Sequence, residues 1–548
     1  MIAILHGYLL EGSGSNLWTR AVVESLCRRG ETVHLVCQEN HPERYDFIAR
    51  AYEYQPDGRV RTLLTRRVPY AGHCILHKPK LAEPLPVYVW DRYEEFAHVV
   101  PMVELPDEVI ERYVRRNVEV VRRVVLKHGV TALHANHAVL MSVVARRVGQ
   151  ERGVPYAIMP HGSAIEYAVK KDARFLRLAR EAFADAATVF VIGTEMRQRL
   201  LSVFEGTPGL ADKLTELPLG VDTSRFEPVT REQRAVPIRR LQQAVAALPA
   251  GRPEEATARL RAELHPHLRL EELQSVLNSR PDYPEKRPDA KLAEKLDLVD
   301  WRHDPVVLFV GRLIAAKGPQ TLLAALPMLL ESTPSLRVVV VGHGPLREAL
   351  EAWLWALEHG AEPVLRELAN RGRALEGGPP EPWWEVKHYF DALEREGQWA
   401  PYLYNARNYV RPERVLFTGY LTHNELRHLF PCCDAAVFPS VVKEAGPLVF
   451  LEALASGVFP VGTYFGGMAA SIDAVAARLP DAHAALMKLS PDPKQTVRDL
   501  VARLPQTLRL SDPTRDVFRR LAVERFDWEN VSRKLVETLR GLSVGGEA

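Results

Sequence analysis

The sequence predicts an α/β protein with two doubly wound domains, and three observations support this fold class. The chain has 548 residues, more than one hydrophobic core usually organises. Short apolar runs alternate with helical patterns through the first 230 residues, and the same alternation begins again near residue 305. Strands that alternate with helices typically form a parallel sheet with helices on both faces.

The alternation also predicts where the domains lie. Residues 1–230 are expected to form an N-terminal domain, with strands such as "MIAILHG" and "TVFVIGT". Residues 301–523 are expected to form a second domain, with strands such as "PVVLFVGR" and "DAAVFPS". Residues 231–300 and 351–412 exceed an ordinary connection and are interpreted as mainly helical insertions. The segment "GGPPEPWWEVKHYF" in the second insertion is interpreted as an aromatic loop.

The tail, residues 524–548, is predicted to be helical and to pack back on the N-terminal domain. Trp528, Val531 and Leu535 share one face at helical spacing, which favours a structural role for that face.

The composition excludes several classes of protein. The net charge of +2 gives no indication of nucleic-acid binding. No apolar run reaches the roughly 20 residues of a membrane-spanning helix, and the N-terminus is interpreted as a buried strand, not a signal peptide. The five cysteines include no Cys-x-x-Cys pair, which argues against a structural zinc site or a disulfide framework and fits the cytoplasm. The oligomeric state stays open.

Two cations follow a predicted strand in "VVLFVGRLIAAKGPQTLLAAL". The strand ends at Gly311, Arg312 and Lys317 lie on the next loop, and Pro319 suits the first turn of a helix. Cations at the carboxyl end of a strand, beside a helix N-terminus, suit a phosphate or diphosphate. The alternative is that both are solvated loop charges.

Two glutamates lie eight residues apart in "KEAGPLVFLEALASG". Glu444 is expected on the loop before a helix that begins at Pro447, and Glu452 inside that helix. Backbone groups near Gly446, Pro447 and Leu448 could bind sugar hydroxyls or phosphate oxygens. In the simpler interpretation, Glu444 complements the helix dipole and Glu452 lies on a solvated face.

Taken together, "GRLIAAKG" and the later Glu-x7-Glu resemble the retaining glycosyltransferases of family 4, with support from "GYLLEGSGSNLW", "MPHGSAIEY", "LPLGVDTSRF" and "VGHGPLREAL". The resemblance implies the GT-B architecture, two Rossmann-like domains that face each other across a cleft. It also implies transfer of a hexose, glucose or mannose, from a nucleotide diphosphate sugar to an acceptor hydroxyl with retention of anomeric configuration. UDP-glucose is the first expected donor and GDP-mannose the second. A sugar, a sugar phosphate, a glycerate-like acid and a lipid are open as acceptors.

The resemblance also implies residue roles. Gly311, Arg312 and Lys317 would hold the donor diphosphate. Glu444, with Gly446, Pro447 and Leu448, would contact the transferred sugar, and Glu452 the ribose. His161 would lie near the reacting sugar. Gly12, Ser13 and Gly14 would approach the donor phosphate or the acceptor.

The chain lacks an Asp-x-Asp sequence, so we expect no metal and no cofactor beyond the nucleotide sugar. The family's usual Gly-Phe-Gly after the first glutamate is here Ala445-Gly446-Pro447, and Pro447 offers no N–H.

Three alternatives stay open. One is another GT-B enzyme, such as a sugar-nucleotide epimerase or a glycoside phosphorylase, and another is a non-catalytic sugar-binding protein. A nicotinamide dehydrogenase is disfavoured because Leu17 stands where its fingerprint needs glycine.

Lys170, Arg174 and Arg177 are expected to share one helix face, which could meet a phosphorylated acceptor or an anionic membrane surface.

Overall fold

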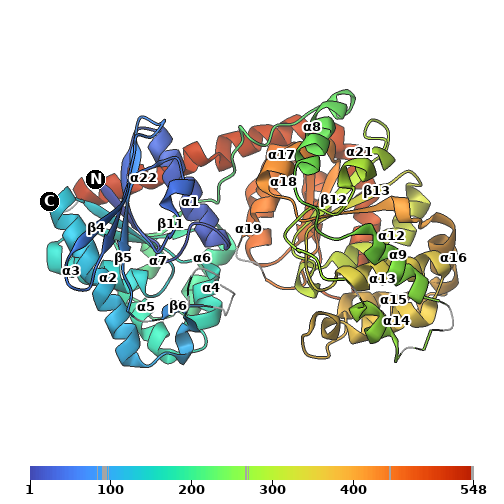
Figure 1. Cartoon of the computed structure of the whole chain (residues 1–548), viewed down its shortest axis with the longest axis horizontal. Helices are drawn as coiled ribbons and strands as arrows, with labels where there is room; N and C mark the ends of the chain where they lie inside the picture. The colour runs from blue at the N-terminus through green and yellow to red at the C-terminus, as the bar shows by residue number, and fades with distance from the viewer. Residues whose placement is uncertain are drawn as a thin grey trace. The chain divides into compact units, whose positions relative to one another are not determined.

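The computed structural model of the chain describes residues 1–82, 84–88, 96, 98–265, 268–269, 271–279, 281–443 and 446–544. The chain forms two compact units (Figure 1). The first contains Met1–Gly220 and Glu524–Ala548, and the second contains Val221–Val523. Each unit has one extended, largely parallel sheet with helices around it, which confirms the predicted α/β fold class.

The sheet of the first unit has the strand order β11-β10-β9-β8-β1-β2-β5-β3-β4. All neighbouring strands are parallel except β3 and β4. The strands are β1 Ile2–Leu5, β2 Thr32–Val36, β3 Ile48–Tyr54, β4 Val60–Thr65, β5 His73–Pro79, β8 Ala132–Asn136, β9 Tyr156–Met159, β10 Thr188–Val191 and β11 Leu214–Glu216, with β6 Leu85–Val87 and β7 Val99–Pro101 forming a separate pair.

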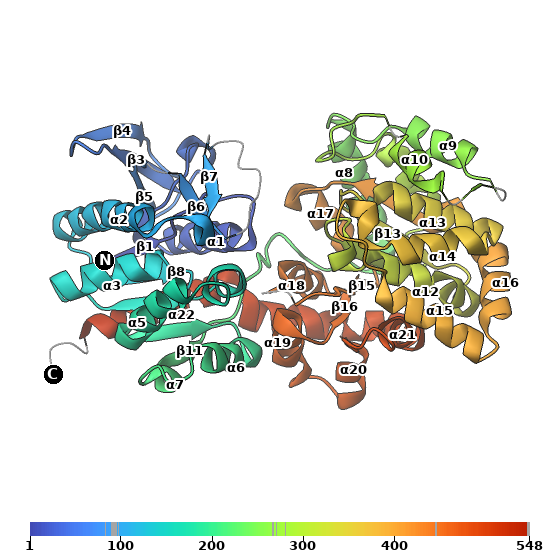
Figure 2. The same ribbon diagram turned by 90° about the horizontal axis from the view of Figure 1, so that it is seen from below.

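Two hydrophobic cores cover opposite faces of this sheet. One joins it to α2, α3 and α5, and the other joins it to α1 and α22. Figure 2 shows α2, α3 and α5 beside the strands of this unit. The helices are α1 Gly14–Arg28, α2 Asp107–His128, α3 Met141–Arg152, α4 Gly162–Ala164, α5 Ala173–Asp185, α6 Thr194–Val203, α7 Leu210–Lys213 and α22 Trp528–Val544.

The second unit has a wholly parallel sheet with the order β14-β13-β12-β15-β16-β17. Its strands are β12 Val306–Val310, β13 Arg337–Val341, β14 Val415–Gly419, β15 Ala435–Phe438, β16 Phe459–Thr463 and β17 Lys488–Leu489. Its helices are α8 Ala235–Ala246, α9 Glu254–Glu263, α10 Leu273–Asn278, α11 Leu292–Lys295, α12 Pro319–Ser332, α13 Arg347–His359, α14 Glu362–Arg371, α15 Trp384–Arg395, α16 Trp399–Tyr409, α17 His423–Leu429, α18 Leu448–Ala455, α19 Gly466–Ala476, α20 Asp481–Leu486 and α21 Thr496–Leu521.

The second half of the aromatic segment in the second insertion is a helix, so the predicted loop is correct for residues 377–383 and wrong from Trp384 onward. Residues from Trp384 onward form α15. The ring of Trp353 lies 5.8 Å from Trp383 and 5.7 Å from Phe390, and all three are buried. These aromatic side chains drive the segment to fold because burying them removes a large apolar area from water.

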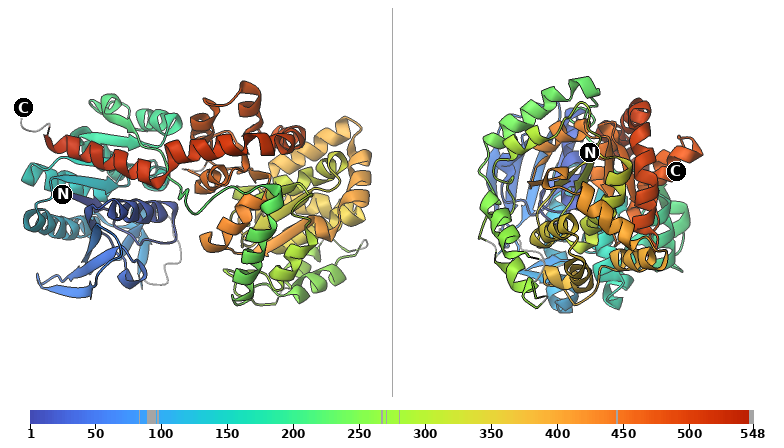
Figure 3. Two further views of the ribbon diagram at one scale, coloured as in Figure 1. Left: turned by 90° about the horizontal axis from the view of Figure 1, so that it is seen from above. Right: turned by 90° about the vertical axis from the view of Figure 1, so that its right-hand side faces the viewer.

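The C-terminal helix α22 completes the core of the first unit. Val531 and Leu535 are buried in the same core as α1, and Ser25 Oγ donates to the backbone oxygen of Trp528 at 3.1 Å. Figure 3 shows α22 (red) along the strands and helices of this unit. The contacts confirm the structural role predicted for its apolar face.

The packing of Trp528 against Gly220 gives a testable prediction. A Cβ at Gly220 would lie 2.2 Å from Cε3 of Trp528, so Gly220→Ala should lower the free energy of unfolding by about 1–3 kcal/mol. Gly541→Ala on α22 is the matched control because its Cβ would meet no atom within 4 Å. Calorimetry of both variants checks this, and equal melting temperatures would contradict the packing of α22 described above.

Candidate active site

The loops after β12 and β13 interlock backbone against backbone. A Cβ on Gly342 would lie 1.8 Å from the oxygen of Gly311, and one on Gly344 would lie 2.6 Å from the oxygen of Leu313. The N–H of Leu313 donates to the oxygen of His343 at 2.8 Å. Only glycine therefore fits at positions 342 and 344, and this close fit holds Arg312 at the carboxyl end of the sheet.

Arg312 and Lys317 lie between β12 and α12. Lys317 ends a short turn of 3₁₀ helix, and Gly318 (φ 73°) precedes Pro319, the first residue of α12. Arg312 is exposed and forms no ion pair with any residue that the structure describes. Two cations beside a helix N-terminus make an anion-binding arrangement. The positions of Gly311, Arg312, Lys317 and Pro319 at the strand end and helix start are those predicted.

The second insertion supports this loop. Glu376 Oε2 accepts a hydrogen bond from the N–H of Ala315 at 2.8 Å. Glu385 Oε1 accepts from Gln320 Nε2 at 2.8 Å, and burial raises the pKa of Glu385. Residues 351–412 thus hold both ends of the turn that contains Lys317.

Glu452 is a buried carboxylate on α18, and only one of its two oxygens has a partner among the described residues. Its Oε1 lies 2.8 Å from Nε2 of His423, at the start of α17. Its Oε2 is buried and has no hydrogen-bond partner among the described residues. Because an unpaired buried carboxylate oxygen is costly, a ligand donor such as a hydroxyl would stabilise it. The expectation that Glu452 lies on a solvated face is wrong.

The loop before α18 is described only in part. Glu444 lies outside the described residues. Pro447 is the N-cap residue and Leu448 begins the helix, one residue later than predicted. The first N–H groups of α18, beginning with Leu448, have no acceptor within the helix. Gly446 is half-buried beside them.

Two aromatic side chains at this sheet edge were not predicted. His343 follows β13 and Tyr420 follows β14, and their rings pack edge to face with centroids 5.4 Å apart. His343 Nδ1 lies 3.5 Å from Oε2 of Glu285, which comes from the first insertion. The sequence signal was the Gly-His-Gly after β13, which resembles a ligand-binding turn but does not identify its partners.

The candidate residues of the second unit line one edge of its sheet. Tyr420, His343, Arg312 and Gly446 follow β14, β13, β12 and β15, which is the order of those strands in the sheet. In open α/β sheets, ligands bind outside the carboxyl ends of the strands. This edge therefore offers aromatic, cationic and helix N-terminal groups side by side.

His161 of the first unit belongs to a buried polar network. Its Nε2 lies 3.2 Å from Oδ1 of Asn136, and Asn136 Nδ2 lies 3.2 Å from Nδ1 of His6. Asn136 is the last residue of β8, and His6 and His161 come just after β1 and β9, the neighbours of β8 in the sheet. Burial lowers the pKa of His161 to about 3 and that of His6 to about 4, so both rings are neutral at neutral pH.

His137 also belongs to this cluster, although it was not predicted. Its ring centroid lies 4.7 Å from that of His161, and both of its ring nitrogens are buried without a partner among the described residues. Its backbone φ of 73° is rare for a residue with a side chain. Such strain and an unpaired buried ring are typical of functional sites. No pattern in "ALHANHAVL" distinguishes this histidine from His134.

Gly12, Ser13 and Gly14 are exposed at the start of α1. Ser13 is the N-cap, and its Oγ accepts from the N–H of Asn16 at 3.3 Å. Asn16 Oδ1 lies 2.9 Å from Nε2 of His6, so the loop is joined to the network of His161.

The predicted basic helix face is wrong. Lys170 precedes α5 and pairs with Glu166 at 2.7 Å. Arg174 pairs with Asp107 and Asp172, each at 2.7 Å, at the start of α5. The charges of Lys170 and Arg174 are thus paired within the unit, and Arg177 is exposed on α5, so the three do not form the single basic face that was predicted.

In the part of the chain that the structure describes, no helix has both the length and the apolar character to cross a bilayer.

Two glycosyltransferase family models match the chain. The Glycosyl transferase 4-like domain matches residues 13–220, and Glycosyl transferases group 1 matches residues 299–362 and 400–477. An uncharacterized glycosyltransferase from Methanocaldococcus jannaschii is 26% identical over 165 residues, 30% of this chain and 28% of that protein. The D-inositol 3-phosphate glycosyltransferase of Corynebacterium urealyticum is 28% identical over 243 residues, 43% of each chain. The matches thus span less than half the length of these relatives.

Solved structures share the fold. Sucrose-phosphate synthase from Thermosynechococcus elongatus aligns with a TM-score of 0.51 at 16% identity, over 99% of each chain. The Anabaena protein HepE in complex with UDP aligns with a TM-score of 0.51 at 14% identity, over 98% of this chain and 99% of that chain.

Proposed function

Because this chain is a glycosyltransferase with the GT-B fold, we propose that it moves a hexose from a nucleotide diphosphate sugar to an acceptor hydroxyl, with retention and without a metal ion. UDP-glucose is the proposed donor and GDP-mannose the second choice. The UDP complex of HepE supports a uridine donor by analogy of fold alone.

The observation that carries the proposal is the paired cation loop between β12 and α12. Departure of the nucleoside diphosphate places negative charge on its phosphate oxygens in the transition state. Arg312, Lys317 and the N–H groups at the start of α12 would meet that charge without rearrangement, because interlocked glycine loops and Glu376 already hold the turn. Such preorganised electrostatic stabilisation is usually the largest single term in catalysis.

Glu452 would hold the ribose of the donor. Its unpartnered Oε2 can accept from a ribose hydroxyl while His423 occupies Oε1. Glu444 and the N–H of Leu448 would contact the transferred sugar. Neutral His161 and its neighbour His137 would bind hydroxyls of that sugar or of the acceptor, because a neutral imidazole has one donor and one acceptor nitrogen.

The proposed retention of configuration and the proposed metal independence both follow from binding of the diphosphate by Arg312 and Lys317. The cations replace the divalent ion that would otherwise neutralise the diphosphate. The departing phosphate oxygen is then free to take the proton of the acceptor hydroxyl as that oxygen attacks the same face of the sugar. No covalent nucleophile is assigned.

Donor binding tests the proposal directly. UDP and UDP-glucose should raise the melting temperature in a buffer that contains EDTA, because a ligand that binds only the folded state stabilises it. GDP-mannose and ADP-glucose are the comparison ligands. A shift that appears only after Mg²⁺ or Mn²⁺ is added would exclude metal independence, and no shift with any nucleotide sugar would exclude the proposed function.

The cation loop gives a prediction about turnover. Arg312→Ala and Lys317→Ala should each lower kcat about a hundred- to thousandfold, since one lost electrostatic contact costs roughly 3–4 kcal/mol in the transition state. Arg302→Ala, an exposed cation before β12, should retain full activity. Release of UDP from UDP-glucose is the measurement, and near-native kinetics in either loop variant would refute the assignment.

Substitutions of Glu452 and Glu444 should affect different steps, UDP binding and sugar transfer respectively. Glu452→Ala should weaken UDP binding about 10- to 100-fold, since a hydrogen bond to a charged group contributes roughly 1.5–3 kcal/mol. Glu444→Ala should slow transfer and leave UDP binding intact. Glu331→Ala, on the exposed side of α12, is the control for both. Calorimetric titration measures binding. If Glu444→Ala loses UDP first, the two roles are reversed.

A further inference from the structure

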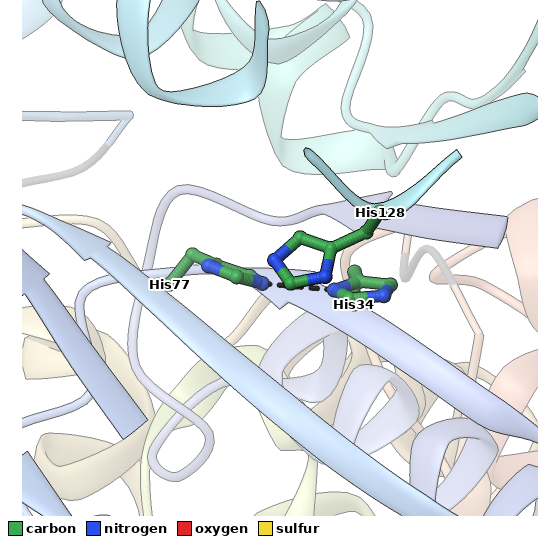
Figure 4. Close-up of side chains that lie close together, drawn as sticks. All are labelled: His34, His77 and His128. Carbon is green, nitrogen blue, oxygen red and sulfur yellow. Dashed lines mark hydrogen bonds between the residues drawn. The ribbon is translucent and has the colours of Figure 1, made fainter. Parts of the chain in front are cut away.

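Three histidines of the first unit that are not among the candidate site residues converge. His34 is on β2, His77 is on β5, and His128 is the last residue of α2. One nitrogen from each ring lies within 4.8 Å of the nitrogens of the other two. Figure 4 shows the three rings turned toward one another. Among the described residues, this is the only group of three or more His, Cys, Asp or Glu side chains whose ligand atoms all lie within 4.8 Å of one another.

The fold explains the convergence. β2 and β5 are parallel neighbours, with His34 opposite Ile75 and Val36 opposite His77. Residues two apart on a strand point to the same face, so both histidines face the side of the sheet that α2 covers. α2 ends above them, and Gly129 in the left-handed conformation terminates it directly after His128.

We propose that His34, His77 and His128 bind one divalent transition-metal ion of the zinc class. Imidazole nitrogen is a preferred ligand for such ions. Tetrahedral zinc with bonds of about 2.0–2.1 Å needs nitrogens about 3.3 Å apart. His34 Nδ1 and His77 Nε2 are 2.9 Å apart, and a ring nitrogen of His128 lies within 4.8 Å of the ligand atoms of both, so the three rings would shift to reach the tetrahedral spacing. Water would take the fourth position.

Tyr54 orients the second ligand. Its hydroxyl lies 2.8 Å from Nδ1 of His77, the nitrogen that faces away from His34. When Nδ1 donates to this hydroxyl, the lone pair of Nε2 is free for the metal. Metal-bound histidines almost always have such a partner on the other ring nitrogen.

The metal-free arrangement leaves a polar atom unsatisfied. The one hydrogen bond between His34 and His77 uses Nδ1 of His34, and its Nε2 is buried without a partner among the described residues. Burial lowers the pKa of His34 to about 4 and that of His77 well below its usual value, so both rings are neutral ligands at neutral pH. A metal on Nδ1 of His34 and Nε2 of His77 would replace the hydrogen bond between these two neutral rings, and Nε2 of His34 would stay without a partner among the described residues.

The groups around His128 have opposing effects on the binding of a cation. Lys127 and Arg50 lie close enough to His128 to disfavour positive charge there, although burial is the larger cause of its lowered pKa. The carbonyl end of α2 lies at the same point and favours a cation. The site has no carboxylate ligand, which favours zinc-class ions over Mg²⁺ or Ca²⁺.

Metal titration of the full chain tests the proposal. Protein stripped with EDTA and dialysed should bind one equivalent of Zn²⁺ in competition with a chromophoric chelator, and Zn²⁺ should raise its melting temperature. Co²⁺ in place of Zn²⁺ should give the visible absorption of a tetrahedral nitrogen site.

Variants separate this site from adventitious binding. His128→Gln, at a half-buried helix end, should abolish the Zn²⁺-dependent stabilisation, whereas His41→Gln, at a half-buried histidine of the same unit that pairs with Glu43, should retain it. Tyr54→Phe should weaken Zn²⁺ binding about 10- to 100-fold. Tyr70→Phe, which removes a comparable hydroxyl bonded to Asp46, should have no effect.

Two results would overturn the proposal. One is the absence of stoichiometric Zn²⁺ binding by the native chain. The other is equal Zn²⁺ affinity in the native protein and His128→Gln, which would leave the three rings as a packed, hydrogen-bonded cluster without a ligand.

Discussion

The candidate active site of the second unit depends on how closely its strand-end loops approach one another. At Gly342, Gly344 and Gly318, an added Cβ would fall 1.8–2.6 Å from a backbone oxygen of the neighbouring loop. Each loop is therefore fixed by the next one along the sheet edge. Arg312 is exposed and Lys317 is half-buried, and the closely packed backbone beneath them holds both side chains in position.

The two units meet this demand for rigidity differently. The second unit uses glycine contacts and buttressing carboxylates from its insertion, namely Glu376 and Glu385. The first unit uses a chain of side-chain hydrogen bonds, from Asn16 through His6 and Asn136 to His161. In both, the groups that would meet a ligand rest on partners that are buried, so their orientation is set before a ligand arrives.

Local patterns predicted the elements that carry the second-unit site. A buried strand, a glycine, two cations and a helix-starting proline are all within fourteen residues, so "VVLFVGRLIAAKGP" could be interpreted without tertiary information. β4 was missed because its residues are mostly exposed and provide no apolar signal. His137 could not be singled out, since its strain is a property of the folded backbone. The histidine cluster joins positions 34, 77 and 128, which only the strand order and the length of α2 bring together.

The division of the first unit between the two ends of the chain has a consequence for biosynthesis. Val531, Leu535 and Leu539 of α22 fill the same core as Trp18 and Val22 of α1. On the ribosome, the strands made first therefore keep an open apolar face while all of Val221–Val523 is synthesised. This core can therefore be completed only after the whole of the second unit has been synthesised.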